Sequence, residues 1–284
     1  MCLILAAWEN HPTNRLIIAS NRDEFLDRPT LAMHRWKNKS GIVAGRDIKA
    51  GGTWLGVTRN GRFAAITNFR NPSDQRENAP SRGKIVTDFL ESNLDAATFL
   101  NRFKPGAQKF NGFNLLAGDQ NSLYWFSNIK DRVTRLSPGY HGLSNHLLNT
   151  PWPKVARGKK ALKELLARGN NITPQAIFPL LKERAQPNDG ELPDTGVGIE
   201  KERMLAPIFI KSPTYGTRCS TVLIITREGT INLCEQTYDQ FDEQEKNEYR
   251  ERCFTWQTGS QRVQQRSDSG RLHLGRSEMS PTRD

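Results

Sequence analysis

Runs of consecutive apolar residues predict most of the β-strands in this chain. In residues 15–20 and 222–225 the apolar side chains follow one another rather than alternating with polar ones. Such runs are typical of strands that are covered on both faces. The predicted strands span residues 3–8, 15–20, 53–58, 62–69, 113–119, 122–128, 219–226 and 230–238.

Apolar residues at helical spacing predict helices in the stretches between these strands. The predicted helices span residues 84–92, 95–103, 153–168 and 173–184. Thr173 followed by Pro174 is a favourable helix start, with a capping hydroxyl and a proline in the first turn. Strands in hairpins with grouped amphipathic helices indicate an α+β fold. Because several strands are apolar on both faces, we predict a four-layer αββα sandwich of two antiparallel sheets with helices outside.

The pattern indicates one domain over residues 1–256. From residue 257 to 284 the chain is rich in Gln, Ser, Arg and Gly and has no apolar periodicity. This composition predicts a disordered tail. A second polar stretch, residues 185–203, is predicted to be a long surface loop.

Charge and composition indicate which class of ligand to expect and in which compartment to expect the protein. The net charge is +11, but Lys and Arg are scattered and form no run of the kind that marks a nucleic-acid patch. We therefore interpret the charge as attraction for small anionic ligands rather than for nucleic acid. No stretch approaches the roughly 20 apolar residues of a membrane helix. No basic residues precede the apolar run at the start of the chain, as they would in a secretory signal peptide. We therefore expect a cytoplasmic protein.

The cysteines and histidines show no metal-binding spacing. Cys2, Cys219, Cys234 and Cys253 include no CxxC pair, which favours reduced thiols. The five histidines fit no zinc pattern, and phosphate-loop and dinucleotide fingerprints are missing. We therefore expect no metal site and no required cofactor.

Turn residues place several polar side chains at one predicted rim. If Trp8 pairs with Arg15, antiparallel register puts Cys2 opposite Asn21. Two further hairpins turn at residues 60–61 and 228–229. Their open ends complete a rim that includes Cys2, Asn21, Arg22, Asp23, Thr53, Asn68 and Arg218.

Such a rim has the groups for nucleophilic catalysis on a carbonyl. If Met1 is removed, Cys2 bears both a thiol and a free α-amine, which could act as its base. Asp23 would orient the ammonium, and Arg218 or Arg22 would favour the thiolate. The side-chain amides of Asn68 and Asn145 could donate hydrogen bonds to an oxyanion.

Each of these residues also has a purely structural interpretation. Cys2 fits a core strand, because buried cysteine is common. Residues 21–24 fit a turn in which Asn21 and Asp23 bond to their own backbone. The remaining structural alternatives are a core position for Trp54, a cap for Asn145 and an ion pair with Asp239 for Arg218.

Seven blocks in this order resemble the NRDE family, the transport and Golgi organisation protein 2 family. They are MC, SNRDEFLDRP, GGTWLG, AAITNF, FNGFNLLAGD, GLSNHLLNTPWPKV and YGTRCSTVLI, spread over most of residues 1–256. The family is similar to cysteine N-terminal-nucleophile hydrolases, which have an αββα fold and cleave linear amides. The resemblance implies Cys2 as nucleophile and site roles for Asn21, Asp23, Asn68, Asn145 and Arg218. Ser20 stands where the hydrolases have a catalytic arginine.

The resemblance implies two functions from different classes. The first is a cytoplasmic protein that binds or transports haem or an acyl ligand such as acyl-coenzyme A in a hydrolase-type pocket, with Asn21, Arg22 and Trp54 as binding residues. Haem would then be cargo, and the family links the protein to Golgi organisation, secretion and lipid metabolism. The alternative is a cysteine amidohydrolase. A third hypothesis, from net charge alone, is an accessory protein at an RNA or membrane surface.

Overall fold

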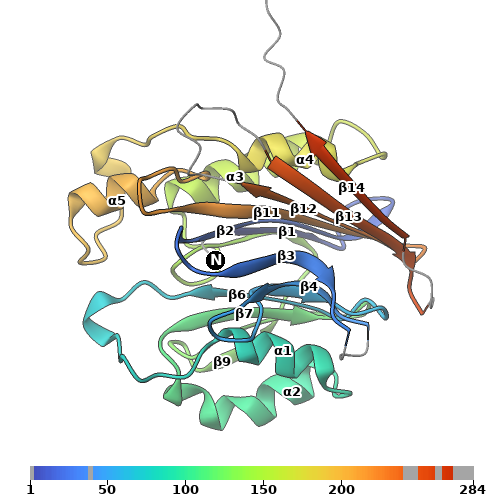
Figure 1. The fold of residues 1–284 in the computed structure, drawn as a ribbon, viewed down its shortest axis with the longest axis horizontal. Coiled ribbons are helices and arrows are strands. Elements are labelled where there is room, and N and C mark those ends of the chain that lie inside the picture. The colour runs from blue at the N-terminus through green and yellow to red at the C-terminus, as the bar shows by residue number, and fades with distance from the viewer. Residues whose placement is uncertain (1–2, 38–40, 239–248, 260–263, 271–284) are drawn as a thin grey trace, which may run out of the picture.

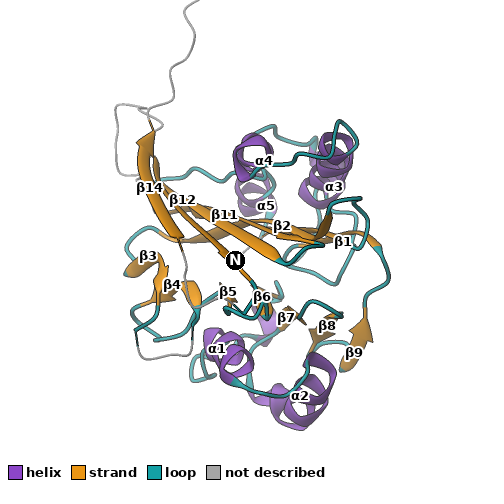
Figure 2. Cartoon of the chain, turned by 90° about the vertical axis from the view of Figure 1, so that its right-hand side faces the viewer, coloured by secondary structure: helices purple, strands orange, loops and turns teal. Residues whose placement is uncertain are grey.

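Two seven-stranded antiparallel sheets pack face to face, with helices on both outer sides, in the computed structural model (Figure 1). The structure describes residues 3–37, 41–238, 249–259 and 264–270. Seen from the side, the layers follow one another as helices, sheet, sheet and helices (Figure 2). This arrangement confirms the predicted αββα sandwich.

The first sheet brings strands from both ends of the sequence together, in the order β10-β1-β2-β11-β12-β13-β14. Its strands are β1 (Leu3–Trp8), β2 (Asn14–Phe25), β10 (Gly139–Leu143), β11 (Tyr215–Thr226), β12 (Thr230–Tyr238), β13 (Tyr249–Gln257) and β14 (Gln264–Gly270). Strand β2 lies between β1 and β11, so it is paired along both edges.

The second sheet follows chain order, from β3 to β9. Its strands are β3 (Thr30–Arg35), β4 (Val43–Asp47), β5 (Leu55–Val57), β6 (Phe63–Asn68), β7 (Phe113–Gly118), β8 (Leu123–Ser127) and β9 (Arg132–Arg135). Each strand pairs only with its sequence neighbours; β6 and β7 do so although residues 69–112 separate them.

The helices divide between the two outer faces. Helices α1 (Gly83–Glu91) and α2 (Ala96–Phe103) pack on the second sheet, and α3 (Pro153–Leu166) and α4 (Pro174–Leu181) pack on the first. Helix α5 (Ile199–Leu205) lies on the same side as α3 and α4 (Figure 1). Short 3-10 turns span Pro72–Asp74, Lys104–Lys109 and Asp189–Glu191.

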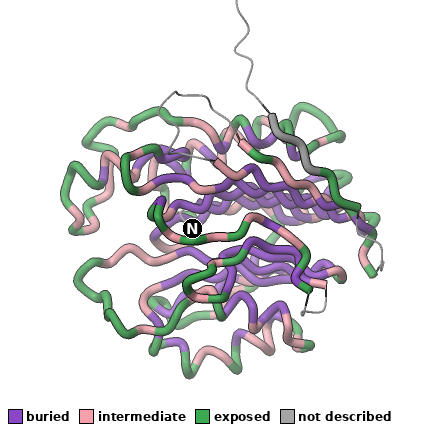
Figure 3. The backbone as a smooth tube through the Cα atoms, in the orientation of Figure 1, coloured by how far each residue is buried: buried purple, intermediate pink, exposed green. Residues whose placement is uncertain are grey.

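Alternating residues of β2 separate the core into layers. Ile18 belongs to the apolar cluster between the two sheets, together with Ile4, Phe63 and Leu223. Ile17 belongs to the cluster between the first sheet and helices α3 and α4. A third apolar cluster lies between the second sheet and α1 and α2. The buried part of the chain runs through the strands of both sheets (Figure 3). Side chains on both faces of β2 are therefore buried, which explains its unbroken apolar run.

The long apolar elements are confirmed, and the polar ones differ from the prediction. All eight predicted strands and all four helices are present; residues 3–8 and 230–238 have the predicted ends, and the ends of the other elements are shifted. Strands β3, β4, β9, β10 and β13 were not predicted, because they are short or mix polar and apolar residues. The predicted loop 185–203 contains a 3-10 turn and the start of α5.

The predicted disordered tail is wrong for residues 264–270, which form β14 against β13. The predicted boundary at residue 256 also falls inside β13. Backbone hydrogen bonds to a neighbouring strand need no apolar periodicity, so the composition of this segment gave no signal for it. Residues 271–284 lie outside the described residues.

All three predicted hairpin registers are shifted by one residue; in the second, Leu55 pairs with Ala65. Leu3 pairs with Asn21, so the predicted pairing of residue 2 with Asn21 is wrong. The reason is the longer first turn, in which Glu9 has a φ of 46° and its N–H donates to Arg15. In the third hairpin Cys219 pairs with Thr237, again one residue from the prediction.

A disulfide joins Cys234 of β12 to Cys253 of β13, directly opposite each other in the sheet. The expectation of reduced thiols is therefore wrong for this pair. Their register comes from a strand that the sequence did not predict, so the spacing of 19 residues gave no indication of a bond. Cys219 is a free, buried thiol.

Candidate functional site

The stretch Asn21–Glu24 lies inside β2 rather than in a turn. Its side chains alternate between the two faces of the sheet, as strand geometry requires. Asn21 and Asp23 lie on the face that is covered by helices, whereas Arg22 faces the second sheet. The turn interpretation of this stretch is therefore wrong, and the motif serves two different layers of the fold.

Asn21 ties β2 to the helical layer. Its side-chain amide donates to the carbonyl oxygens of Leu181 and Ile208, each at 2.8 Å, and its Oδ1 accepts from Ser220 at 2.7 Å. Leu181 is the last residue of α4, and carbonyl groups at a helix end have no partner within the helix. Asp23 accepts a hydrogen bond of 2.6 Å from the hydroxyl of Thr217.

Arg22 is a buried cation stacked on an aromatic ring. Its guanidinium carbon lies 4.3 Å from the ring centre of Trp54, and the residue is 3% exposed. Its Nη2 lies 3.9 Å from carboxylate oxygens of both Glu24 and Asp47. The cation–π contact and these acidic neighbours partly compensate for the removal of the guanidinium from water.

The double glycine before Trp54 explains how this ring reaches the site. Gly51 has a φ of 75°, a conformation that favours glycine, and a Cβ on Gly52 would lie 2.5 Å from the backbone of Gly83 at the start of α1. The chain can pass α1 this closely only because residue 52 has no side chain. The turn therefore fixes the position of Trp54, which directly precedes β5.

Arg22, Trp54 and Arg218 line one pocket between the sheets. The pocket measures about 270 Å³ including space that is open to solvent, and its other lining residues are Thr30, Ala32, Cys219, Glu235 and Thr237. Arg218 donates to the carbonyl oxygens of Phe25 and Arg28 at 2.8 and 3.1 Å. We call this space the arginine pocket.

Burial disfavours the charged forms of two ionisable groups in the arginine pocket. Burial raises the pKa of the Glu235 carboxyl, although Met33 N–H donates to it at 2.6 Å. Burial, with nearby Glu235 as a further cause, raises the pKa of the Cys219 thiol well above its usual range. A thiol with a raised pKa is a poor nucleophile, so Cys219 fits a packing role.

The variant Glu235→Gln tests the state of this carboxyl. A glutamate with a raised folded-state pKa stabilises the fold most below its unfolded pKa, near 4.5, and this contribution is lost as pH rises through the folded value. We expect the wild type to lose unfolding free energy relative to the variant over the pH range above about 4.5, by about 1.4 kcal/mol per unit of pKa shift. Urea unfolding of both proteins across this range measures the difference. A pH-independent difference would contradict the raised pKa.

Asn68 and Asn145 meet where the two sheets are joined by hydrogen bonds. Asn145 Nδ2 donates to the carbonyl oxygen of Asn68 at 3.2 Å. Beside them the Thr67 hydroxyl donates to the carbonyl oxygen of Ser144 at 2.8 Å, again between the sheets. Ser144 follows β10 and lies near the start of β1, because Leu143 pairs with Ile4. The two asparagines therefore share one end of the sandwich with the first residues of β1.

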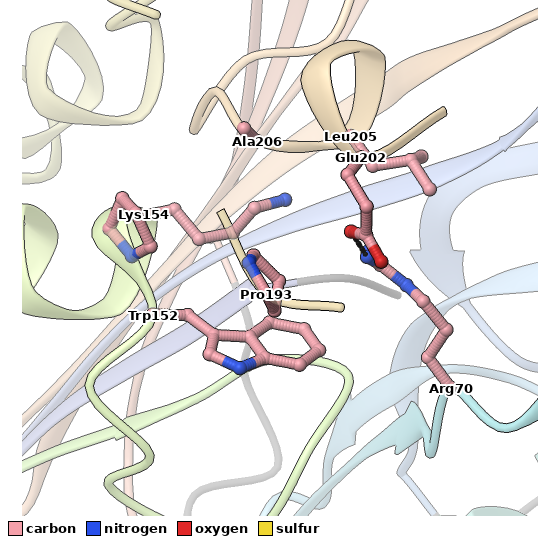
Figure 4. Close-up of a pocket in the computed structure, with 8 residues that line it drawn as sticks. Arg70, Trp152, Lys154, Pro193, Glu202, Leu205 and Ala206 are labelled. Atoms are coloured by element: carbon pink, nitrogen blue, oxygen red, sulfur yellow. Dashed lines mark hydrogen bonds and ion pairs between the residues drawn. The ribbon is translucent and has the colours of Figure 1, made fainter. Parts of the chain in front are cut away.

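A second pocket lies beside these asparagines, under α5 (Figure 4). Arg70, whose backbone N–H donates to Asn145, forms an ion pair of 2.6 Å with Glu202 of α5. The Arg70 guanidinium also lies 5.0 Å from the ring centre of Trp152. Figure 4 shows Trp152 and Pro193 beside this ion pair. Glu202 thus connects the segment 189–206 to the asparagine end of the sandwich.

The structure divides the predicted site residues into three groups. Arg22, Trp54 and Arg218 share the arginine pocket, Asn68 and Asn145 bond to each other, and Asn21 and Asp23 face the helices. Cys2 lies outside the described residues, as does Asp239, the structural partner considered for Arg218. The predicted roles of all these residues stay predictions.

Sequence reasoning missed Glu235, Arg70 and Glu202. Glu235 is the one acidic residue inside an otherwise uncharged strand, and a lone charge in an apolar run was the available signal. Arg70 and Glu202 are 132 residues apart, and nothing in the local pattern connects them.

The described part of the chain contains no candidate metal site and no candidate membrane-spanning helix. Within residues 3–37, 41–238, 249–259 and 264–270, no three His, Cys, Asp or Glu side chains gather in a way that could hold a metal ion. None of the helices that the structure describes has the length and apolar character to cross a bilayer.

Comparisons with known proteins give a family match over most of the chain. The family model described as Transport and Golgi organisation 2 matches residues 1–240. The Transport and Golgi organization protein 2 homolog of Bos taurus is 34% identical over 84% of this chain and 93% of its own length. The Drosophila melanogaster protein of the same name is 26% identical over 85% of this chain and 94% of its own length.

The matches to solved structures have low sequence identity and TM-scores below 0.5. The N-acylethanolamine-hydrolyzing acid amidase ortholog of Caenorhabditis elegans is 12% identical, with a TM-score of 0.48 over 78% of this chain and 92% of that chain. The conjugated bile acid hydrolase of Clostridium perfringens, as its C2A mutant, is 9% identical, with a TM-score of 0.48 over 94% of this chain and 96% of that chain.

Proposed function

Because the chain belongs to the Transport and Golgi organisation 2 family, we propose that it binds and transports a small amphipathic ligand, haem or an acyl compound such as acyl-coenzyme A, in the cytoplasm. The arginine pocket is the observation on which this proposal depends. Ligands of this kind combine an apolar body with anionic groups, and the pocket offers an aromatic ring beside two guanidinium groups.

A second function, cleavage of a linear amide with Cys2 as nucleophile, is favoured by the position of β1. Its first described residue, Leu3, pairs with Asn21, and the segment that bears Asn145 lies along the other edge of β1. Amide side chains near a chain terminus are the donors that an oxyanion would need. Removal of Met1 and a free amine on Cys2 are requirements of this mechanism.

Titration of wild type and Cys2→Ala with haemin and with a long-chain acyl-coenzyme A separates the two functions. For a transport protein we expect both proteins to bind equally, because Cys2 is not needed for binding, and neither to cleave an N-acyl amide. Hydrolysis by the wild type that is lost in Cys2→Ala would instead establish the amidohydrolase. No binding of either ligand by the folded wild type would refute the transport proposal.

A further inference from the structure

We propose that the arginine pocket binds a carboxylate, the charged end of an organic ligand, on the Nη1 edge of Arg22. This inference rests on the proposed function, because it assigns the chemistry of the same pocket. It goes beyond it by naming the group that enters and the nitrogen that receives it.

Arg22 has an unused hydrogen-bond donor inside the protein. Its Nη1 is buried and has no hydrogen-bond partner among the residues that the structure describes. On the other side of the same guanidinium, Nη2 faces Glu24 and Asp47. An unsatisfied buried donor is costly, and arginine cannot relieve the cost by losing its proton. An acceptor that enters from the pocket would remove this cost.

The walls of the pocket favour an acid group at this position. Arg218 provides a second guanidinium, and Trp54 provides a flat apolar surface under the first. Burial raises the pKa of Glu235, which weakens the competition of its carboxyl group for Arg22. Thr30 and Thr237 complete a polar lining.

The geometry and charge favour a carboxylate over a phosphate. A planar guanidinium edge matches the two oxygens of a carboxylate, and Arg22 is held over the ring of Trp54. Glu24 and Asp47 lie 3.9 Å from Nη2, so a doubly charged phosphate would meet more repulsion than a singly charged carboxylate.

Calorimetric titration of the full chain with sodium hexanoate tests the inference, with hexanamide and inorganic phosphate at the same ionic strength as comparisons. We expect hexanoate to bind and hexanamide and phosphate not to bind. Arg22→Met removes the donor but keeps the apolar stem, and should weaken hexanoate binding about ten- to a hundredfold, as for loss of a hydrogen bond to a charged group.

A matched control is Arg62→Met. Arg62 also stacks on an aromatic ring, with its guanidinium carbon 4.3 Å from the ring centre of Phe89, but it lies outside the arginine pocket. Its variant should bind hexanoate within about twofold of the wild type. If Arg22→Met does not fold, Thr237→Phe, which fills the pocket and leaves Arg22 in place, should abolish binding.

Three results would overturn the inference: no hexanoate binding by the folded wild type, equal binding of hexanamide or phosphate, or unchanged binding in Arg22→Met. These results are distinct from failure of the proposed function. A protein that binds hexanoate through Arg22 but neither haemin nor acyl-coenzyme A refutes only the transport proposal. A protein that binds haemin equally well with and without Arg22 refutes only the carboxylate site.

Discussion

Substitution of Asn21 by leucine is expected to lower the free energy of unfolding by about 3–5 kcal/mol, because it removes three buried hydrogen bonds and leaves polar partners unpaired. The amide of Asn21 reaches the carbonyl oxygens of Leu181 and Ile208, and Ser220 donates to its oxygen. Leucine has a similar volume, so the loss comes from polar groups rather than from a cavity. Urea unfolding monitored by circular dichroism measures the difference.

The matched control is Asn232→Leu in the same sheet. Asn232 lies on β12, is only half-buried, and accepts one hydrogen bond of 3.0 Å from Thr255. Water can replace this partner, so we expect a loss of about 1 kcal/mol or less. If both variants were equally stable, Asn21 would not connect β2 to the helices. A role for Asn21 in direct ligand binding would then need to be considered again.

The variant Glu202→Ala is expected to lower the unfolding free energy by about 3–5 kcal/mol and to release α5 from the sandwich. Glu202 is 3% exposed and accepts from Arg70 at 2.6 Å and from both the backbone and the hydroxyl of Thr195. Its removal leaves Arg70 without its buried counter-charge, which costs more than a surface pair is worth. Amide hydrogen exchange should become faster in α5 and in the segment that precedes it.

The control for this variant lies one half-turn away, at Glu200. Its side chain is 82% exposed and pairs with Arg203 at the surface. Surface ion pairs are screened by solvent and salt, so Glu200→Ala should leave both stability and exchange nearly unchanged. Faster exchange in both variants would mean that α5 depends on its own helical propensity rather than on the buried ion pair.

The local pattern of apolar residues predicted the long buried strands and the helices. The remaining strands and the strand registers depend on pairing between distant segments. Strands such as β1 and β7 bury nearly every side chain, so their apolar runs were clear in the sequence. Strand β9, with an exposed arginine at each end and two partly buried residues between them, gave no comparable signal. One-residue shifts in the hairpins arose because turn length depends on backbone geometry, such as the positive φ of Glu9, and not on apolar pattern.

The candidate site was less predictable than these strands and helices, because its residues come from distant segments of the chain. Strand periodicity does place Arg22 on the face opposite to Asn21 and Asp23. It could not show that Trp54, Arg218 and Glu235 would line the same pocket, since those neighbours come from three other parts of the chain. Motif residues that are adjacent in sequence therefore perform separate tasks in this structure.

The C-terminal strands separate the extent of sequence similarity from the extent of the folding unit. The family match ends at residue 240, yet Phe254 and Trp256 of β13 belong to the core between the two sheets, and the Trp256 indole donates to the carbonyl oxygen of Arg59. A chain cut where the family match ends would leave this part of the interior open to water. The stretch of chain that identifies the family is thus shorter than the stretch that is needed to complete the hydrophobic core.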